Sequence, residues 1–197
     1  MKKALLLVSV LFISVVSTAC INKFAVQELN NKAKSYIEQG DYQNAIERLK
    51  SSVDLDDTVF ETHYNLAVAY TQAEDYPNAI TSFKKAIEIN PDFADSYYSL
   101  AVAQEDFSVD LAKGNLVLDE TGKPVKPDEK EQEAKEKITL TPETAKLIDE
   151  LLTDAVNNYS LYLQKGTDAQ DGDEVREKIE QLNEEKANNQ TNSNTAG

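Results

Sequence analysis

The sequence predicts an all-α fold in which about three helix-turn-helix repeats stack into a superhelix that ends in a capping helix. Two observations predict this fold. The segment "GDYQNAIERLK" from Gly40 recurs as "EDYPNAITSFK" from Glu74, thirty-four residues later, and a fixed period of about 20–50 residues is typical of stacked repeats. Between residues 142 and 165, apolar side chains recur at helical spacing.

Residues 1–19 have the features of a bacterial export signal. Two lysines precede an apolar run from Ala4 to Val16, and small residues lead up to Ala19. The apolar run has about 13 residues, whereas a membrane-spanning helix needs roughly 20. We therefore expect residues 1–19 to be a cleaved signal peptide.

The single cysteine, Cys20, follows the predicted cleavage site directly. Thr18-Ala19-Cys20 resembles the lipobox of bacterial lipoproteins, although Ser17 stands where that family usually has an aliphatic residue. The resemblance implies that Cys20 carries lipid, that residues 20–25 form a tether, and that the membrane is a partner through this anchor. It also implies an exported protein held at the cell envelope, facing the periplasm from the outer membrane if the cell is diderm. The alternative is an ordinary signal peptide whose cleavage exposes a thiol.

Self-alignment at the offset of thirty-four residues superposes Tyr36, Tyr42 and Ala45 on equivalent residues of the next repeat. The period and the residue types resemble the tetratricopeptide repeat, a helix-turn-helix unit. The second repeat carries most of that pattern: His63, Leu66, Ala67, Tyr70, Ala79, Phe83, Ala86 and Pro91. Small residues allow neighbouring helices to approach, and large ones fill the space between repeats.

The third repeat begins with "DSYYSLAVAQEDF", but its second helix is displaced downstream to "LLTDAVNNYSLYLQKG". We infer that an insert of about 34–42 residues separates the two helices. Thr141 is expected to cap the second helix, whose first residue is Pro142. The predicted organisation is a repeat domain over residues 26–183, with repeats at 26–59, 60–93, and 94–107 plus 142–166, an insert at 108–141, a capping helix at 173–183 and a disordered tail at 184–197.

The insert has two halves with different character. "NLVLDETGKPVKP" contains Thr121-Gly122 and is compatible with a short hairpin, while Pro124 and Pro127 limit the second strand. "DEKEQEAKEKI" is a charged run that suits either a solvated helix or a linker. A lid over a binding groove is the alternative, because long insertions in compact domains are often functional.

Composition and motifs argue against a catalytic site, a metal site and nucleic-acid binding in this chain. The net charge is −15, which disfavours nucleic acid as a partner because phosphates are bound by Lys and Arg. One histidine and one cysteine are too few for a zinc site of His and Cys ligands, and no HExxH, Walker or GxGxxG motif is present. We expect no catalytic residue, no metal and no cofactor, and a packing role for His63.

In tetratricopeptide proteins the first helix of each repeat lines a concave groove that holds a peptide. The resemblance implies that this groove is lined mainly by Asn30, Lys34, Tyr64, Asn65, Val68, Tyr98 and Val102, with Gln27, Glu61, Asp95 and Glu105 also facing inward. Tyrosine gives a large contact area at low entropic cost. Tyr64 and Tyr98 are therefore the expected binding hot spots, unless they pack between helices.

Some members of this family hold a peptide carboxylate with Asn, Lys and Arg in the groove. Asn65 matches one such place, but Asp95 and Ser99 stand where two basic residues would be. The resemblance therefore implies a basic or apolar protein segment of the cell envelope as the partner rather than a carboxylate.

These observations favour a protein-interaction scaffold or assembly factor at the cell envelope that is not an enzyme. One alternative is a small-molecule-binding lipoprotein, associated with a transporter, whose insert covers a pocket. Another is a structural module that oligomerises through its terminal helices.

Overall fold

The computed structural model describes residues 22–127, 140–166 and 171–195, with side chains described to residue 189. The chain forms two compact units, Met1–Asn90 and Pro91–Gly197, and each is described by itself. The predicted fold class is confirmed, because the described chain consists of paired helices and one small hairpin. The predicted signal peptide and Cys20 lie outside the described residues.

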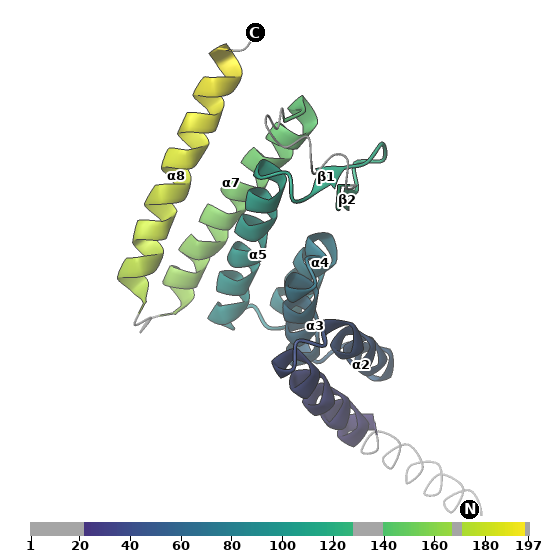
Figure 1. Cartoon of the computed structure of the whole chain (residues 1–197). Helices are drawn as coiled ribbons and strands as arrows, with labels where there is room; N and C mark the ends of the chain where they lie inside the picture. Colours follow the sequence, from purple (N-terminus) through teal and green to yellow (C-terminus); the bar gives the residue numbers. More distant parts are fainter. Residues whose placement is uncertain (1–21, 128–139, 167–170, 196–197) are drawn as a thin grey trace, which may run out of the picture. The chain divides into compact units, whose positions relative to one another are not determined.

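The first unit consists of two helix-turn-helix repeats (Figure 1). A helix over residues 22–38, here called the N-terminal helix, is followed by α2 (Tyr42–Leu55). The second repeat pairs α3 (Phe60–Gln72) with α4 (Tyr76–Ile89). Helix α3 packs against both α2 and α4.

The repeated Asp-Tyr-x-Asn-Ala-Ile segment forms the start of the second helix in both repeats. Asp41 is the N-cap of α2, and its carboxylate accepts hydrogen bonds from the backbone N–H of Asn44 at 3.3 Å and from the Asn44 amide at 2.7 Å. The equivalent Asn78 donates to Asp75 at 2.7 Å. The bond from the Asn44 backbone N–H uses a group that a helix start leaves without an intrahelical partner, whereas the bonds from the Asn44 and Asn78 amides join side chains across the first turn. The repeated segment is thus a capping and packing motif.

The turn before each of these helices has a left-handed residue. Gly40 has φ of 74° and Glu74, thirty-four residues later, has φ of 58°. In each turn the N–H three residues past the helix bonds back across the turn, from Asp41 to Tyr36 O and from Asp75 to Tyr70 O, both at 2.9 Å. This C-terminal motif favours glycine, so the second repeat forms the same turn with a less suitable residue.

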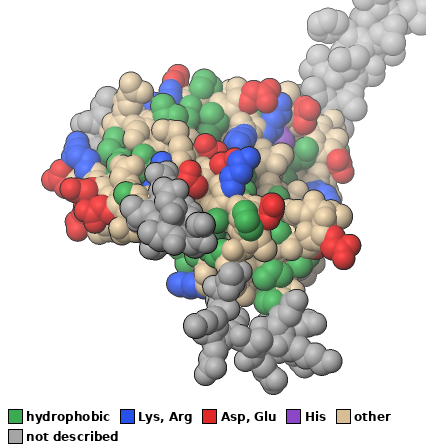
Figure 2. Space-filling view, turned by 90° about the horizontal axis from the view of Figure 1, so that it is seen from above, with side chains coloured by type: hydrophobic (Ala, Val, Ile, Leu, Met, Phe, Trp, Pro, Cys, Tyr) green, Lys and Arg blue, Asp and Glu red, His purple; other side chains and the backbone are tan. Residues whose placement is uncertain are grey.

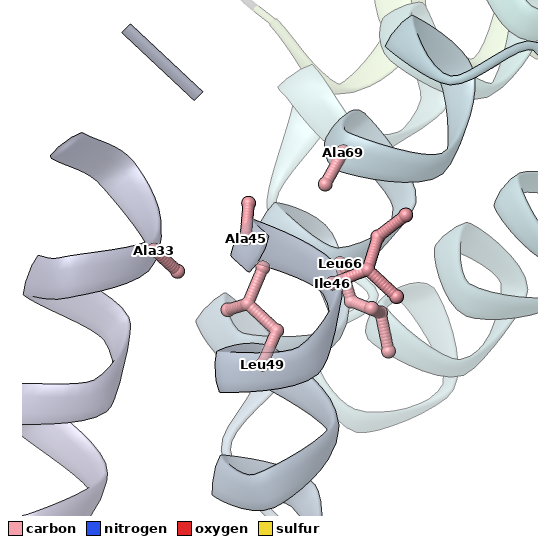
Figure 3. Close-up of a cluster of buried hydrophobic side chains, with 6 residues drawn as sticks. All are labelled: Ala33, Ala45, Ile46, Leu49, Leu66 and Ala69. Atoms are coloured by element: carbon pink, nitrogen blue, oxygen red, sulfur yellow. The ribbon is translucent and has the colours of Figure 1, made fainter. Parts of the chain in front are cut away.

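The core of the first unit is built from small and branched side chains that meet between the N-terminal helix, α2 and α3. Ala33, Ala45 and Leu49 are fully buried, and Figure 3 shows them with the other buried members of this cluster, Ile46, Leu66 and Ala69. Alanine at the contact points allows the helix axes to approach, while Leu49 fills the space between them.

The second unit contains three long helices that lie side by side, α5 (Ala94–Ala112), α7 (Pro142–Lys165) and α8 (Gly172–Thr195) (Figure 1). Helix α7 packs against both α5 and α8. As predicted, α7 begins at Pro142, and the Thr141 hydroxyl caps it by accepting from the Thr144 N–H at 3.2 Å.

The first helix of the third repeat is longer than predicted. We expected it to end near residue 107, but α5 continues to Ala112 and has 19 residues where α3 has 13. Phe107 and Leu111 are buried, so further apolar contacts extend the helix by more than a turn. Helix α5 then ends in the same left-handed turn, with Gly114 at φ of 64° and a bond from Asn115 N to Asp110 O at 2.8 Å.

The described part of the insert forms the expected short hairpin. Strand β1 (Val117–Leu118) pairs antiparallel with β2 (Pro124–Val125). Its turn is organised by the carboxylate of Asp119, which accepts from the N–H groups of Thr121 and Lys123 and from the Thr121 hydroxyl. The charged half of the insert, residues 128–138, lies outside the described residues, so the expected helix, linker or lid there stays a prediction.

The predicted end of the capping helix is wrong. We expected a helix over residues 173–183 and a disordered tail, whereas α8 continues to Thr195. Val175 and Leu182 are buried on its inner side. Beyond them the chain has neither Gly nor Pro before Gly197 and contains the good helix formers Glu184, Glu185 and Lys186.

Within the ranges that the structure describes, none of the helices is both long and apolar enough to cross a membrane.

Candidate binding cavities

The first unit has a cavity of about 390 Å³ between the N-terminal helix and α3. It is lined by Lys23, Val26, Gln27, Asn30, Asn31, Lys34, Val59, Glu61 and Asn65. Three of the predicted groove residues, Asn30, Lys34 and Asn65, are thus brought together. The lining carries two lysines and one glutamate among amides, so this cavity does not have the acidic character expected of the groove.

Asn30 has a structural role besides lining this cavity. Its amide nitrogen lies 2.9 Å from Ser52 Oγ, 2.9 Å from Thr62 Oγ1 and 3.0 Å from Val26 O, so its two hydrogens are shared among three acceptors. Asn65 donates to Asn30 Oδ1 at 3.3 Å. This network links the N-terminal helix, α2 and α3, and the two hydroxyls in it, of Ser52 and Thr62, are fully buried.

Two other predicted groove residues of α3 do not line this cavity. The Tyr64 ring packs edge-on against Phe83 of α4, with centroids 5.7 Å apart, so it contributes to helix packing as the alternative interpretation held. Val68 is partly buried and lines neither cavity described here. His63 is buried, and its Nε2 lies 2.9 Å from Asp57 O, in agreement with the expected packing role.

The second unit has a cavity of about 430 Å³ where α5, α7 and α8 meet. It is lined by Tyr98, Val102, Glu105, Asp106, Tyr159, Glu174, Val175, Glu177, Lys178 and Gln181. Tyr98 and Val102, the predicted groove residues of the third repeat, are therefore both at this cavity. Tyr98 keeps 36% of its surface exposed, which leaves it accessible to a ligand.

Glu105 is the centre of a hydrogen-bonded cluster in this cavity. One carboxylate oxygen accepts from the Tyr159 hydroxyl at 3.0 Å, and the other pairs with Lys178 Nζ at 2.6 Å. The pair raises the pKa of Lys178, mainly through its hydrogen bond to Glu105. Burial, together with the Glu105 charge, raises the pKa of the Tyr159 hydroxyl, which therefore stays a neutral donor.

A second set of polar contacts links helices α5 and α7. The buried Gln104 accepts from the Asn158 amide at 2.8 Å and donates to Asp154 at 3.3 Å. Near the start of α8, the Tyr162 hydroxyl donates to Asp171 at 2.8 Å, and this bond raises the pKa of Tyr162 to about 12. These bonds hold in place the tyrosine-bearing face of α7.

Sequence reasoning missed the contribution of α8 to the second cavity. Glu174, Glu177 and Lys178 belong to the predicted capping helix, whose charges suggested a solvated face. The repeat pattern ends before α8, so it gives no register for that helix. The described part of the insert lines neither cavity.

The charges of the chain are not segregated into one large patch on the face seen in Figure 2, where carboxylates, basic and hydrophobic side chains are interspersed. Among the described residues, no group of three or more His, Cys, Asp or Glu side chains is arranged to hold a metal ion.

Comparison with protein-family models shows which residues match a known repeat. A family model described as "TPR repeat" matches residues 33–73 and 69–106. Residues 33–106 carry tetratricopeptide (TPR) repeats. No curated protein matches the chain.

Several solved TPR structures share this fold. The first TPR of Spaghetti (RPAP3) bound to HSP90 peptide SRMEEVD is 17% identical with a TM-score of 0.54, over 79% of this chain and 90% of that one. The TPR2B domain of yeast Sti1, in a pHsp70 complex, is 18% identical with a TM-score of 0.54, over 84% and 98%. The Arabidopsis OM64 TPR domain is 11% identical with a TM-score of 0.55, over 80% and 96%. At these identities the similarity establishes the fold alone.

Proposed function

We propose that this chain is a cell-envelope lipoprotein that acts as an interaction scaffold, binding segments of partner proteins on the first helices of its TPR repeats. The observation that carries the proposal is the placement of predicted groove residues. Asn30, Lys34 and Asn65 line one open cavity, while Tyr98 and Val102 line another. All five come from the first helix of a repeat, although the two cavities belong to different units.

A TPR domain bound to an HSP90 peptide and one in a pHsp70 complex are among the similar structures, which supports a protein segment as the ligand. The lipobox-like Thr18-Ala19-Cys20 supports an anchor at the envelope. Two acyl chains or more would be needed for stable anchoring, because a single chain gives only marginal membrane binding. A scaffold of this kind needs no catalytic group.

Site-specific photo-crosslinking in the cell that makes the protein tests this function. A benzoyl-phenylalanine at position 65 or 98 should form a discrete crosslinked adduct with a partner protein, since Asn65 and Tyr98 line the cavities. The matched controls are positions 51 and 150, which are exposed on the second helices α2 and α7. Equal adducts at all four positions, or none at positions 65 and 98, would contradict the assignment.

The anchor is tested separately by cell fractionation of the Cys20→Ala variant. We expect the variant to leave the membrane fraction in which the native chain is found, because the lipid-bearing sulfur is lost. A variant that stays fully membrane-bound would show that Cys20 is not the anchor.

A further inference from the structure

The cavity of the second unit combines a fixed aromatic ring with an excess of carboxylates. The Tyr98 ring packs against two tyrosines of α7, with centroids 5.5 Å from Tyr159 at 69° and 5.1 Å from Tyr162 at 58°. The contact with Tyr159 is edge-on and the contact with Tyr162 is tilted, and close packing against two rings restricts the rotation of Tyr98. Because Tyr98 is still 36% exposed at the cavity, it offers a preorganised aromatic surface.

The charge of the cavity is strongly one-sided. Four carboxylates line it, from Glu105, Asp106, Glu174 and Glu177, against one ammonium group, from Lys178. Lys178 is paired with Glu105 at 2.6 Å. Among the described cations, none lies within ion-pair distance of Asp106, Glu174 or Glu177.

The neighbouring charges already affect one of these carboxylates. Partial burial, with Glu105 and Asp110 nearby, raises the pKa of Asp106, and Lys178 opposes this effect. A carboxyl group whose ionised form is disfavoured by its neighbours gains from an additional cation.

We propose that this cavity binds an arginine side chain of a partner protein segment. The inference depends on the proposed function, because it names the chemistry of the segment that the scaffold would take. A guanidinium group stacks on tyrosine and donates several hydrogen bonds in one plane, which matches one aromatic surface beside several carboxylates. The carboxylates are not arranged as a metal site within the described chain, so an organic cation fits better than an inorganic one.

The arrangement of the cavity carboxylates also favours an arginine over a lysine as the ligand. An ammonium group is a compact point charge that satisfies one carboxylate well, as Lys178 does with Glu105. The remaining carboxylates come from two helices, with Asp106 on α5 and Glu177 on α8. A planar fork with five donors can reach acceptors on both sides.

The test uses the ¹⁵N-labelled full chain and two capped peptides, acetyl-Leu-Arg-Leu-amide and the same peptide with citrulline in place of arginine. Citrulline has nearly the shape of arginine but no charge. We expect the arginine peptide to shift the amide signals of the cavity residues and to bind about tenfold more tightly than the citrulline peptide, since charge-assisted hydrogen bonds are lost in the latter. Equal affinity of the two peptides would overturn the proposal.

Variants of α8 locate the site. The double variant Glu174→Gln/Glu177→Gln should weaken binding of the arginine peptide about tenfold. The matched control Glu180→Gln/Glu184→Gln changes the same charge on the same helix away from the cavity lining and should leave binding within about twofold. Equal loss in both double variants would indicate non-specific attraction to an acidic chain and would overturn the assignment.

Two further measurements, competition by spermidine and comparison with the crosslinking result, distinguish this inference from its alternatives. Spermidine binding more tightly than the arginine peptide, and displacing it, would reassign the cavity to free polyamines and overturn the choice of a protein segment. Failure of the arginine peptide while positions 65 and 98 still crosslink to a partner would overturn this inference and leave the scaffold function standing. Selective arginine binding without crosslinks would support the cavity chemistry and count against the scaffold.

Discussion

The cavity of the first unit is lined by amides, two lysines and one glutamate, whereas the cavity of the second unit is lined by tyrosines, four carboxylates and one lysine. Both lie on the first helix of a repeat, and both units bury alanine at equivalent places of a second helix, Ala45 and Ala79 in the first unit and Ala155 in the second. The repeat pattern therefore sets how helices pack, while the residues at its variable positions set the chemistry of each cavity lining. In the second unit, α8 supplies half of that chemistry from outside the repeats.

The two units also hold their helices together in different ways. In the first, neighbouring helices follow one another across short turns, and the polar network around Asn30 links three of them. In the second, α5 and α7 are separated in sequence by the insert, so their pairing must be stabilised without a short connection. Loop closure over such a length costs entropy, which side-chain contacts have to offset.

The largest expected effects concern the two cores. Leu49 in α2 and Leu152 in α7 are both fully buried, so replacing either with alanine should lower the free energy of unfolding by about 2–5 kcal/mol. Urea denaturation followed by circular dichroism measures this loss. If the units unfold separately, Leu49→Ala should shift one transition and Leu152→Ala the other.

The control for this pair is Leu55→Ala, because Leu55 is 41% exposed and should cost about 1 kcal/mol or less. A loss at Leu55 as large as that at Leu49 would contradict the described core.

A smaller loss is expected from Asn30→Ala. The change removes the donor shared by the buried Ser52 and Thr62 hydroxyls, and leaving buried polar groups with fewer partners costs about 1–3 kcal/mol. The neighbouring Asn31→Ala alters the same cavity at an exposed side chain and should cost little. Equal stability of the two variants would show that the network does not connect the helices of the first unit.

The sequence alone predicted the repeats well, for reasons visible in these residues. Tyr36, Ala45 and Ala79 recur because helix packing restricts them, so their period is readable. The lengthening of α5, the continuation of α8 and the role of Glu174 could not be read in the same way. Helix ends and solvent-facing charges depend on tertiary contacts that leave no period in the sequence.

The turns allow a more precise comparison of the two repeats of the first unit. Glu74 occupies a left-handed position that Gly40 occupies one repeat earlier, and this conformation costs a non-glycine residue about 1 kcal/mol. Glu74→Gly should therefore stabilise the protein by about 0.5–1 kcal/mol, and Gly40→Ala should destabilise it by a similar amount. Thermal unfolding measures both. Destabilisation by Glu74→Gly would mean that the contacts of the glutamate side chain outweigh backbone strain.

The smallest expected effect is a pH dependence at the second cavity. Because the pKa of Asp106 is raised in the folded state, its ionisation destabilises the fold as the pH rises above its ordinary value of 3.8. Asp106→Asn should raise the melting temperature at pH 7 more than at pH 4.

Asp119 provides a control for which the expected pH dependence of stability has the opposite sign. Hydrogen bonds from Thr121 and Lys123 lower the pKa of Asp119, so its ionised form stabilises the fold above its unfolded pKa, and this stability is lost as the pH falls. Asp119→Asn should lower the melting temperature more at pH 7 than at pH 4. The same pH trend in both variants would contradict the assigned electrostatics.

The difference in cavity chemistry is tested most directly by mapping one peptide on the whole chain. Amide chemical shifts of the full chain, titrated with acetyl-Leu-Arg-Leu-amide and with acetyl-Leu-Glu-Leu-amide, report on both cavities at once. We predict that the arginine peptide shifts Tyr98, Val102 and Val175 and leaves Lys34 and Asn65 unchanged, and that the glutamate peptide does not shift the second cavity. Shifts by the arginine peptide at the first cavity, or by both peptides at the second, would contradict the account.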